Sequence, residues 1–433
     1  MKTKNLFGCA LLLSAAAFAQ NAKSDVTVIR AAVLIDGKSD QAKRDQVIVI
    51  RGNRIESVGD AASAKAPAGA KVITFGPGTT VLPGLIDTHT HVFLQGEDPA
   101  EGGYDKYLLN DSIGYRVARA TESARLGLEQ GFTTIRDLET EGAGYADVGL
   151  KQAIAEGHVA GPRMFVVTRA ISTTGGYPLH GYTPEWDWPH GAQLIDGPIE
   201  ARKAAREQME HGADWVKVYM THRSWVDENG KLQSQPTLTL EEIRAITDEA
   251  HNGWHRKVAC HAYNGPGLQR ALDGGCDSIE HGLELTDENV AQMVRQGTWY
   301  VATLVPYYYY WADEKTTAGK RDRARVAVHG PSFTKAYKAG VKIAFGTDAG
   351  SFHWSDPIAK EFEYMVEFGM PPMEAIKAAT SRAAALLEQT GKIGVVAPDA
   401  YADVVAVHGD PLQDVKALQQ VSFVMKDGKV VKQ

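Results

Sequence analysis

Short apolar runs rich in β-branched residues, separated by turn residues, are the first clear pattern along the chain. Turn signals such as Asp36-Gly37 and Gly52-Asn53 punctuate them, and this pattern predicts a small all-β region. Similar runs return near the C-terminus, with a hairpin turn over residues 426–429. We expect the two regions, at residues 20–80 and 390–433, to pair into one small composite β-sandwich domain. The runs span residues 26–33, 46–50, 55–58, 71–75, 403–407, 422–425 and 429–432.

Between these regions, strand-like runs alternate with sequence of helical spacing. Such alternation implies a parallel sheet in an α/β fold, and eight units over roughly 250 to 300 residues favour a closed (β/α)8 TIM-type barrel, here at residues 81–389. A doubly wound open sheet is the alternative, weakened by the lack of a G-x-G-x-x-G motif after the first strand. The predicted strands span residues 81–89, 133–138, 164–171, 215–220, 258–262, 278–281, 299–305 and 343–345. The predicted helices lie near residues 111–130, 146–155, 198–211, 239–250, 267–273, 287–295, 322–339, 357–368 and 372–388.

The composition is that of an ordinary globular chain, with 44% hydrophobic and 23% charged residues among 433. A formal net charge of −7 argues against a nucleic-acid-binding protein, which would need a basic surface. We therefore expect a small-molecule partner rather than a nucleic acid.

One long apolar run stands at the start of the chain, where a targeting segment would be. Lys2 and Lys4 precede apolar residues 6–18, and Ala17-Phe18-Ala19 forms a small-residue exit before Gln20. This pattern predicts a secretory signal peptide at residues 1–19, with an uncleaved anchor as the lesser alternative. We therefore expect a secreted protein, periplasmic in a bacterium, with no membrane span after cleavage.

Cleavage at that site would leave two cysteines, Cys260 and Cys276. Two cysteines are too few for a disulfide scaffold, even in an oxidising compartment. Both lie near the ends of predicted strands, so we expect buried free thiols.

Residues of metal-ligand type recur where predicted strands end. His89 and His91 stand at i and i+2 on one strand, which turns both imidazoles to the same face, and two neutral imidazoles make half of a metal site. In a (β/α)8 barrel the active site gathers at the C-terminal ends of the strands. Four more candidates belong to those strands, namely Lys217, His261, His281 and Asp348.

Each of these six residues also has a structural alternative. A lone histidine is more often hydrogen-bonded in a core, Asp348 could cap a loop, and Lys217 could pair with a buried carboxylate such as Asp137. The recurrence of all six at equivalent strand ends favours a shared metal site.

The order of these residues resembles that of the amidohydrolase superfamily. The resemblance covers nearly the whole chain after the predicted signal peptide. Further matching motifs are PGLIDTHTH, TTIRDLE, IEHG, FGTDAG and PPMEAIKAATSRAAALL. Together they are similar to the branch that contains imidazolonepropionase-like hydrolases, Xaa-Pro dipeptidases, related metal carboxypeptidases and ochratoxinase-like amidases.

The resemblance implies a site for two divalent ions, usually Zn2+. The more buried ion and the outer ion would share one bridging ligand, an N6-carboxylysine at Lys217, because a carbamate supplies the anionic oxygens that an ammonium lacks. The remaining ligands would be His89, His91 and Asp348 for the buried ion, and His261 and His281 for the outer ion.

The same resemblance implies catalysis by metal-activated hydroxide. Asp348 would accept a proton from the attacking water and pass it to the leaving amine. Tyr263 lies two residues after His261 and is the candidate hydrogen-bond donor to the scissile carbonyl. Packing of Tyr263 within a loop is the alternative.

Substrate residues are expected in the loops after the strands. Tyr177 stands where many relatives carry a histidine after TGG, and His180 or His190 could take over its contacts. Tyr307 and His353 follow the last two strands and could line an aromatic pocket, although packing between long loops is an equal alternative.

Two arginines, Arg223 and Arg169, could hold a substrate carboxylate, and the sequence offers no choice between them. Arg136 is expected to pair with its neighbour Asp137 as a structural group.

The leading hypothesis is a secreted metal-dependent hydrolase that cleaves an amide bond in a dipeptide or an N-acyl amino acid with a free carboxylate, including Xaa-Pro or aromatic amides. One alternative is a hydrolase of cyclic amides or lactones at the same site. Another is an inactive barrel that binds a ligand, which the intact set of six candidate ligands disfavours. A homo-oligomer remains open.

Overall fold

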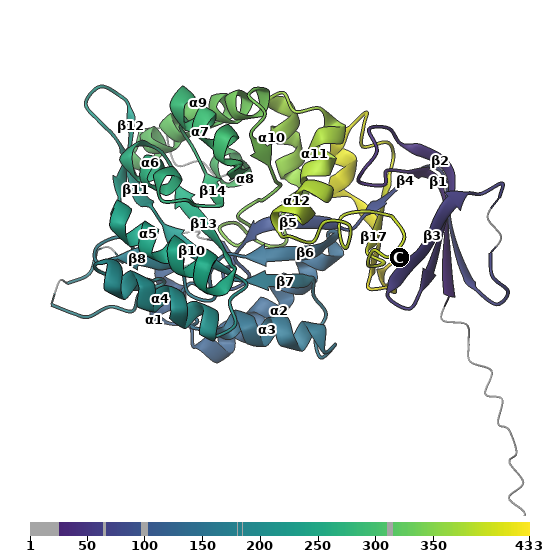
Figure 1. The fold of residues 1–433 in the computed structure, drawn as a ribbon, viewed down its shortest axis with the longest axis horizontal. Coiled ribbons are helices and arrows are strands. Elements are labelled where there is room, and N and C mark those ends of the chain that lie inside the picture. The colour runs from purple at the N-terminus through teal and green to yellow at the C-terminus, as the bar shows by residue number, and fades with distance from the viewer. Residues whose placement is uncertain (1–25, 64–65, 97–102, 180, 184, 310–314) are drawn as a thin grey trace, which may run out of the picture.

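The computed structural model describes residues 26–63, 66–96, 103–179, 181–183, 185–309 and 315–433 (Figure 1). The predicted signal peptide and His180 lie outside these residues. Within them, no helix is both long and apolar enough to cross a membrane. Figure 1 shows a barrel flanked on one side by a β domain that contains the first strands of the chain.

Eight strand positions form the barrel, as the alternating pattern predicted. Neighbouring strands pair in parallel, and the ring closes where Thr88 N donates to Phe345 O at 2.9 Å and His91 N donates to Ala349 O at 2.7 Å. The TIM-type fold prediction is therefore confirmed. The strands are β5 (Leu85–Thr90), β6 (Phe132–Asp137), β7 (Arg163–Val166) with β8 (Ile171–Thr173), β10 (Trp215–Tyr219), β13 (Lys257–Ala262), β14 (Ser278–His281), β15 (Trp299–Val301) and β16 (Lys342–Ile343).

The third predicted strand is in fact two short strands. β7 pairs with β6 and β8 pairs with β10, so residues 164–171 are not continuous. Thr168 breaks the run, because its φ of 65° lies in the left-handed region and its side chain hydroxyl donates to Gln208 Oε1 at 2.6 Å. The strand predicted at 299–305 likewise stops at Val301, and a short helix, α8 (Val305–Tyr309), follows.

One seven-stranded sheet unites the two ends of the chain. In it, β4 runs parallel to β1 and antiparallel to β17, and the apolar side chains of both ends share one core. The rings of Phe75 and Phe423 meet there, with centroids 5.1 Å apart. The strand order is β19 (Lys429–Lys432), β18 (Val421–Lys426), β17 (Val404–His408), β4 (Lys71–Pro83), β1 (Val26–Leu34), β2 (Lys43–Arg51) and β3 (Arg54–Asp60).

The passage from this sheet to the barrel occurs at Gly84, later than predicted. Residues 81–83 belong to β4, because Val81 pairs with Ala406 of β17 rather than with a barrel strand. A side chain at Gly84 would collide with Thr133 on β6. The glycine thus lets β5 begin close against its barrel neighbour.

Helices cover the barrel, mostly where helical spacing predicted them. The helix expected over 372–388 is broken at Thr380, whose φ of −133° and ψ of −100° are not helical. The expected capping box at Thr239 is present. The helix α1 and the hairpin of β11 (Thr221–Val226) and β12 (Leu232–Pro236) were not predicted, nor was β9 (Gln193–Ile195). The helices besides α8 are α1 (Gly103–Leu109), α2 (Ile113–Glu129), α3 (Ala146–Ala155), α4 (Pro198–Glu210), α5 (Leu240–Asp248), α6 (Gly265–Asp273), α7 (Asp287–Gln296), α9 (Thr317–Lys338), α10 (Glu361–Glu367), α11 (Pro372–Ala378) and α12 (Ser381–Leu386).

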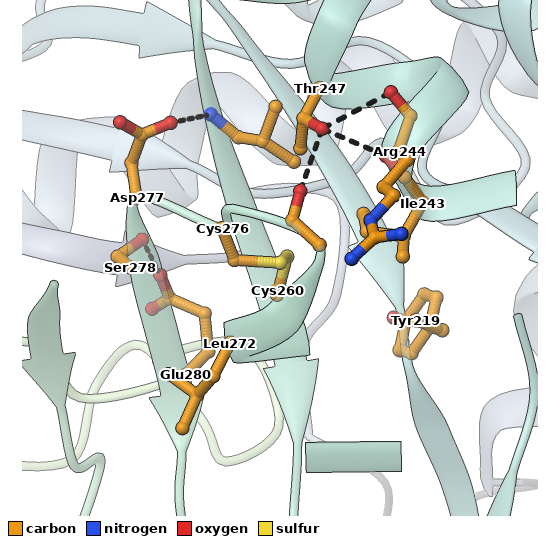
Figure 2. Close-up of a disulfide and its surroundings, with 12 residues drawn as sticks. Tyr219, Ile243, Arg244, Thr247, Cys260, Leu272, Cys276, Asp277, Ser278 and Glu280 are labelled. Carbon is orange, nitrogen blue, oxygen red and sulfur yellow. Dashed lines mark hydrogen bonds between the residues drawn. A yellow bond between two sulfur atoms is a disulfide. The ribbon is translucent and has the colours of Figure 1, made fainter. Parts of the chain in front are cut away.

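The expectation of free thiols is wrong, because Cys260 and Cys276 form a disulfide (Figure 2). Cys260 lies in β13 and Cys276 just before β14, with their Cα atoms 6.1 Å apart. Both residues are buried. The crossover through α6 returns the chain to the neighbouring strand, so two cysteines 16 residues apart in sequence meet in space.

Removing this bridge should lower stability without removing the fold. For the chain without residues 1–19, we expect the Cys260→Ala/Cys276→Ala double variant to lose about 3 kcal/mol of unfolding free energy, because closure of a loop of this length is no longer imposed on the unfolded state. Urea denaturation measures the loss. Alkylation of unfolded, unreduced wild-type protein should label no cysteine, and labelling of both would contradict the disulfide.

Candidate metal centre

Four histidines from three strands of the barrel, β5, β13 and β14, meet at the C-terminal ends of these strands. His89 lies in β5 and His91 directly follows the end of that strand, with ring centroids 5.4 Å apart. His281 ends β14, and its ring centroid lies 4.9 Å from that of His89 and 4.4 Å from that of His261 on β13. The closed barrel therefore brings together all four histidines that the strand ends suggested.

Asp348 joins this histidine group from the loop after β16. Its Oδ1 lies 3.2 Å from His91 Nε2 and 3.4 Å from His89 Nε2. One potential ligand atom from each of His89, His281 and Asp348 lies within 4.8 Å of the other two. Such a set of imidazole nitrogens and a carboxylate oxygen suits a divalent transition metal.

Two observations indicate that these residues can bind cations. The buried Nε2 atoms of His89 and His261 have no hydrogen-bond partner among the described residues, which is costly unless something else satisfies them. Burial also holds the pKa values of His89, His261 and His281 well below the ordinary range. These imidazoles are therefore neutral, the form that binds metal.

His91 differs from the other three histidines. Burial opposes its charge, but the hydrogen bond with Asp348 raises the pKa of His91 to about 9. A cation bound there would have to displace that proton, so metal binding and proton release are linked at this position.

Lys217 reaches the same place from β10, and its side chain is 1% exposed. Its Nζ lies 5.6 Å from the ring centroid of Tyr219. Among the residues with described side chains, no carboxylate lies within ion-pair distance of this amine, and the suggested pair with Asp137 is not formed. Burial outweighs the nearby charges of Glu280 and Asp348 and lowers the pKa of Lys217.

A buried ion pair beneath the histidines orients His89. Glu280 Oε2 lies 2.8 Å from His89 Nδ1, and Glu280 Oε1 accepts a hydrogen bond from Arg136 Nη2 at 2.9 Å. All three side chains are fully buried. The expected partner of Arg136, Asp137, instead accepts from Val92 N at 2.8 Å. Glu280 thus directs His89 Nε2 toward the centre of the site.

The backbone at the strand ends is strained where these groups converge. His281 has a φ of 71° and Asp348 a φ of 62°, both in the left-handed region that L side chains rarely adopt. Thr303, with a φ of 51°, accepts or donates a 2.8 Å hydrogen bond at His281 Nδ1. Strain of this kind persists only where surrounding contacts enforce it, and it gathers at functional sites.

Two buried glutamates lie beside the histidines and were not among the residues predicted from the sequence. Glu141 Oε1 lies 3.4 Å from His91 Nδ1, and its Oε2 accepts hydrogen bonds from Tyr104 and Tyr177. Glu139 Oε2 accepts from Tyr219 at 2.5 Å. Both glutamates follow β6 in the motif TTIRDLETE, so their position at a strand end was the available signal.

The predicted catalytic Tyr263 lies at the edge of the histidine group. Its ring centroid is 4.5 Å from that of His261 and 5.5 Å from that of His281. Tyr307 lies 6.2 Å from His281 on the same side. Both tyrosines therefore lie beside the histidines of β13 and β14.

The other predicted substrate residues lie farther around the rim. Tyr177 packs 4.7 Å from Tyr219 and 4.4 Å from His222, a histidine that the sequence analysis missed. His353 packs against the backbone of Gly96, where an added Cβ would meet its ring at 2.9 Å.

A cavity of about 410 Å³ lies at the other end of the barrel. It is lined by Trp215, Lys257, Trp299 and Lys342, each the first residue of its strand. It therefore does not open onto the histidines, which lie at the C-terminal ends.

Comparison with known proteins gives matches over most of the chain. The model of the amidohydrolase family matches residues 80–431. Ochratoxinase from Aspergillus niger is 31% identical over 95% of this chain and 87% of its own length. A crystal structure of a Xaa-Pro dipeptidase with bound methionine has 34% identity and a TM-score of 0.83 over 94% of this chain and all (100%) of that one. A prolidase complexed with N-methylphosphonate-L-proline has 28% identity and a TM-score of 0.80, with 94% and 100% of the two chains covered.

The positioning role of Glu280 can be tested through metal affinity. We expect Glu280→Gln to raise the dissociation constant for Zn2+ about 10- to 100-fold, because the amide orients His89 less strongly than the carboxylate does. Competition with a chromogenic chelator measures the affinity, and circular dichroism checks the fold. Glu288→Gln, on the exposed first turn of α7, is the matched control and should behave as wild type. Unchanged affinity in Glu280→Gln would contradict the role.

Proposed function

Because the chain belongs to the amidohydrolase family and is a hydrolase acting on carbon–nitrogen bonds, we propose that it cleaves a dipeptide or an N-acyl amino acid with a free carboxylate at a two-metal site. The observation that carries this proposal is the close approach of His89, His281 and Asp348, with ligand atoms within 4.8 Å. The likeness to a Xaa-Pro dipeptidase with bound methionine and to a prolidase complexed with N-methylphosphonate-L-proline supports an amide bond beside an amino acid.

The proposed ligands divide into two groups around Lys217. The more buried ion would be held by His89, His91 and Asp348. The outer ion would be held by His261 and His281, and a carboxylated Lys217 would bind both ions. Divalent ions held there would supply Lewis-acid activation of water and of the scissile carbonyl. The burial that lowers the pKa of Lys217 supports its carboxylation, because only the unprotonated amine can attack carbon dioxide.

Asp348 and Tyr263 are the proposed catalytic side chains. Although burial opposes its charge, the hydrogen bond with His91 keeps the pKa of Asp348 below its usual range. Asp348 is therefore ionised, as a proton acceptor must be, and we propose that it accepts a proton from water and returns it to the leaving amine. Tyr263, beside His261 and His281, would donate a hydrogen bond to the carbonyl oxygen as negative charge develops there.

We also propose that the protein is exported, to the periplasm in a bacterium. The pattern of Lys2, Lys4 and the Ala17-Phe18-Ala19 exit supports a cleaved signal peptide. The disulfide between Cys260 and Cys276 supports it independently, because structural disulfides persist in oxidising compartments and are rare in the cytosol.

Turnover by Lys217 variants tests the proposed reaction. We expect zinc-loaded wild-type protein to release free amino acids from a library of dipeptides and N-acyl amino acids, and Lys217→Ala and Lys217→Arg to release none above background. The arginine keeps a cation but cannot form the same carbamate. Lys257→Arg, at the opposite end of neighbouring β13, is the control and should retain activity.

Two outcomes would contradict this proposal. Release that persists in Lys217→Ala would remove Lys217 from the site. No release by wild-type protein with metal bound would favour cyclic amides or lactones as substrates.

Export can be tested on the chain expressed in a bacterium with its own first residues. We expect the mature protein to appear in the periplasmic fraction and to begin at Gln20, as measured by N-terminal sequencing. Changing Ala17 and Ala19 to bulky residues should block cleavage, because the exit requires small side chains. A chain retained in the cytoplasm with Met1 or Lys2 at its start would contradict export.

A further inference from the structure

We propose that the disulfide between Cys260 and Cys276 positions His261 for the outer metal ion, so that the outer half of the site is completed only when the bridge has formed. The inference rests on the two-metal site of the proposed function. It makes the oxidation state of two cysteines a condition for tight binding of the second ion.

His261 differs from the neighbouring candidate ligands in how its ring is held. His89 Nδ1 lies 2.8 Å from the carboxylate of Glu280, and His281 Nδ1 lies 2.8 Å from Thr303 Oγ1. Within the part of the chain that the structure describes, the ring of His261 has no such hydrogen bond, and its Nε2 is buried. Metal-binding histidines are usually oriented by a hydrogen bond from the second ring nitrogen, so something else must position His261.

Ring packing restricts His261 but does not set its direction. Its ring centroid lies 4.8 Å from that of Tyr219 and 4.5 Å from that of Tyr263. These contacts limit rotation of the imidazole without providing a directional partner for either nitrogen. The place of the ring therefore depends on the backbone of β13.

The bridge holds that backbone at the residue next to His261. Cys260 precedes His261 in β13, and the disulfide ties it to Cys276, two residues before the start of β14 (Figure 2). Side chains alternate along a strand, and Cys260 packs in one core cluster with Ile243 of α5 and Leu272 of α6. The bridge thus fixes β13 from the helix side while His261 points to the centre of the barrel.

The partner strand carries the other outer ligand in an unfavourable conformation. Glu280 points toward His89, so the next residue of a regular strand would point away from the centre. His281 instead has a φ of 71°, in the left-handed region, and its ring centroid lies 4.4 Å from that of His261. Such a conformation persists only where surrounding contacts enforce it. A covalent link between β13 and β14 limits movement of the two outer ligands relative to each other.

The ligands proposed for the more buried ion lie on other strands. His89 belongs to β5 and His91 follows it, while Asp348 follows β16. The disulfide joins none of these segments. Loss of the bridge should therefore weaken the outer site and leave the buried site nearly unchanged.

Bridge formation is an exchange with a disulfide oxidant such as oxidised glutathione. The thiolate of one cysteine attacks the oxidant and releases one glutathione thiol, and the second cysteine then displaces the other. Two protons leave the cysteines, and two electrons pass to the oxidant. Cys276 lines the cavity of about 410 Å³ at the N-terminal ends of the strands, so a small oxidant in that cavity would lie beside it. A chain kept reduced would hold the buried ion with an incomplete outer site.

Zinc affinities of the two sites test the inference in the full protein. The main variant is Cys276→Ala, which removes the bridge and keeps the side chain beside His261. We expect the dissociation constant of the second zinc ion to rise about 10- to 100-fold, as for loss of other groups that orient metal ligands, and that of the first to change less than about threefold. Competition with chelators of graded affinity measures both constants. Cys260→Ala should give the same result, because it removes the same bridge.

Three controls separate the bridge from general stability. Phe423→Leu removes packing in the core of the terminal sheet and should bind both ions as wild type does. Wild-type protein reduced with a phosphine, then freed of it, should resemble Cys276→Ala and regain its second affinity after treatment with oxidised glutathione. If Cys276→Ala does not fold, Cys260→Ala/Cys276→Val refills the space without the covalent bond.

Hydrogen exchange gives a readout that needs no metal. In the metal-free Cys276→Ala variant, amides of residues 257–262 in β13 should exchange faster than in wild type. Amides of residues 85–90 in β5 should exchange at the wild-type rate, because exchange reports local opening and the bridge does not join that strand. Equal acceleration in both strands would show general loosening and would contradict the positioning role.

The outcomes separate this inference from the proposed function. A loss confined to the second ion supports the inference. Two zinc constants that change together, or not at all, overturn it and leave the proposed function standing. Wild-type protein that binds two ions but cleaves no dipeptide or N-acyl amino acid overturns the proposed substrates and not the role of the bridge. Wild-type protein that binds fewer than two ions overturns the two-metal site and this inference with it.

Discussion

The buried pair of Arg136 and Glu280 is the interaction on which the centre of the barrel depends. Both side chains are fully buried, and removing either partner of such a pair leaves an uncompensated charge at a cost of roughly 3 to 5 kcal/mol. The pair also has a geometric effect. Glu280 connects β14 to Arg136 on β6 and to His89 on β5. One carboxylate therefore holds three strands in position relative to one another. The candidate ligand His89 is oriented by the same contact that neutralises the buried arginine.

Features that would be unfavourable elsewhere gather just above this pair. Lys217 is buried without an ion-pair partner in the described part of the chain, and His89 Nε2 is buried without a hydrogen bond there. His281 and Asp348 adopt left-handed backbone conformations. Each feature costs stability by itself. Their coincidence at the C-terminal ends of the barrel strands is the pattern expected when a scaffold maintains a reactive site.

The rim around this site is chemically asymmetric. The side near β6 carries the carboxylates of Glu139 and Glu141 with their tyrosine partners. The side near α9 carries the guanidinium of Arg325 and the rings of Tyr263 and Tyr307. The disulfide between β13 and β14 fixes the strands that carry His261 and His281, and it therefore stabilises the side that holds the outer ligands.

The sequence by itself determined the barrel and indicated the pairing of the two terminal β regions, because alternation and strand periodicity are properties of neighbouring residues. It also indicated, from the strand ends, the histidines and Asp348 that the structure brings together. It did not determine which distant residues meet. The disulfide depends on the crossover through α6, the partner of Arg136 lies 144 residues away, and Arg325 reaches Tyr263 only because α9 packs beside the hairpin of β11 and β12. The split of the third strand at Thr168 likewise follows from side chain hydrogen bonds to α4. Such contacts arise from closure of the ring and the packing of its connections, which local pattern does not encode, and so only the tertiary structure decided them.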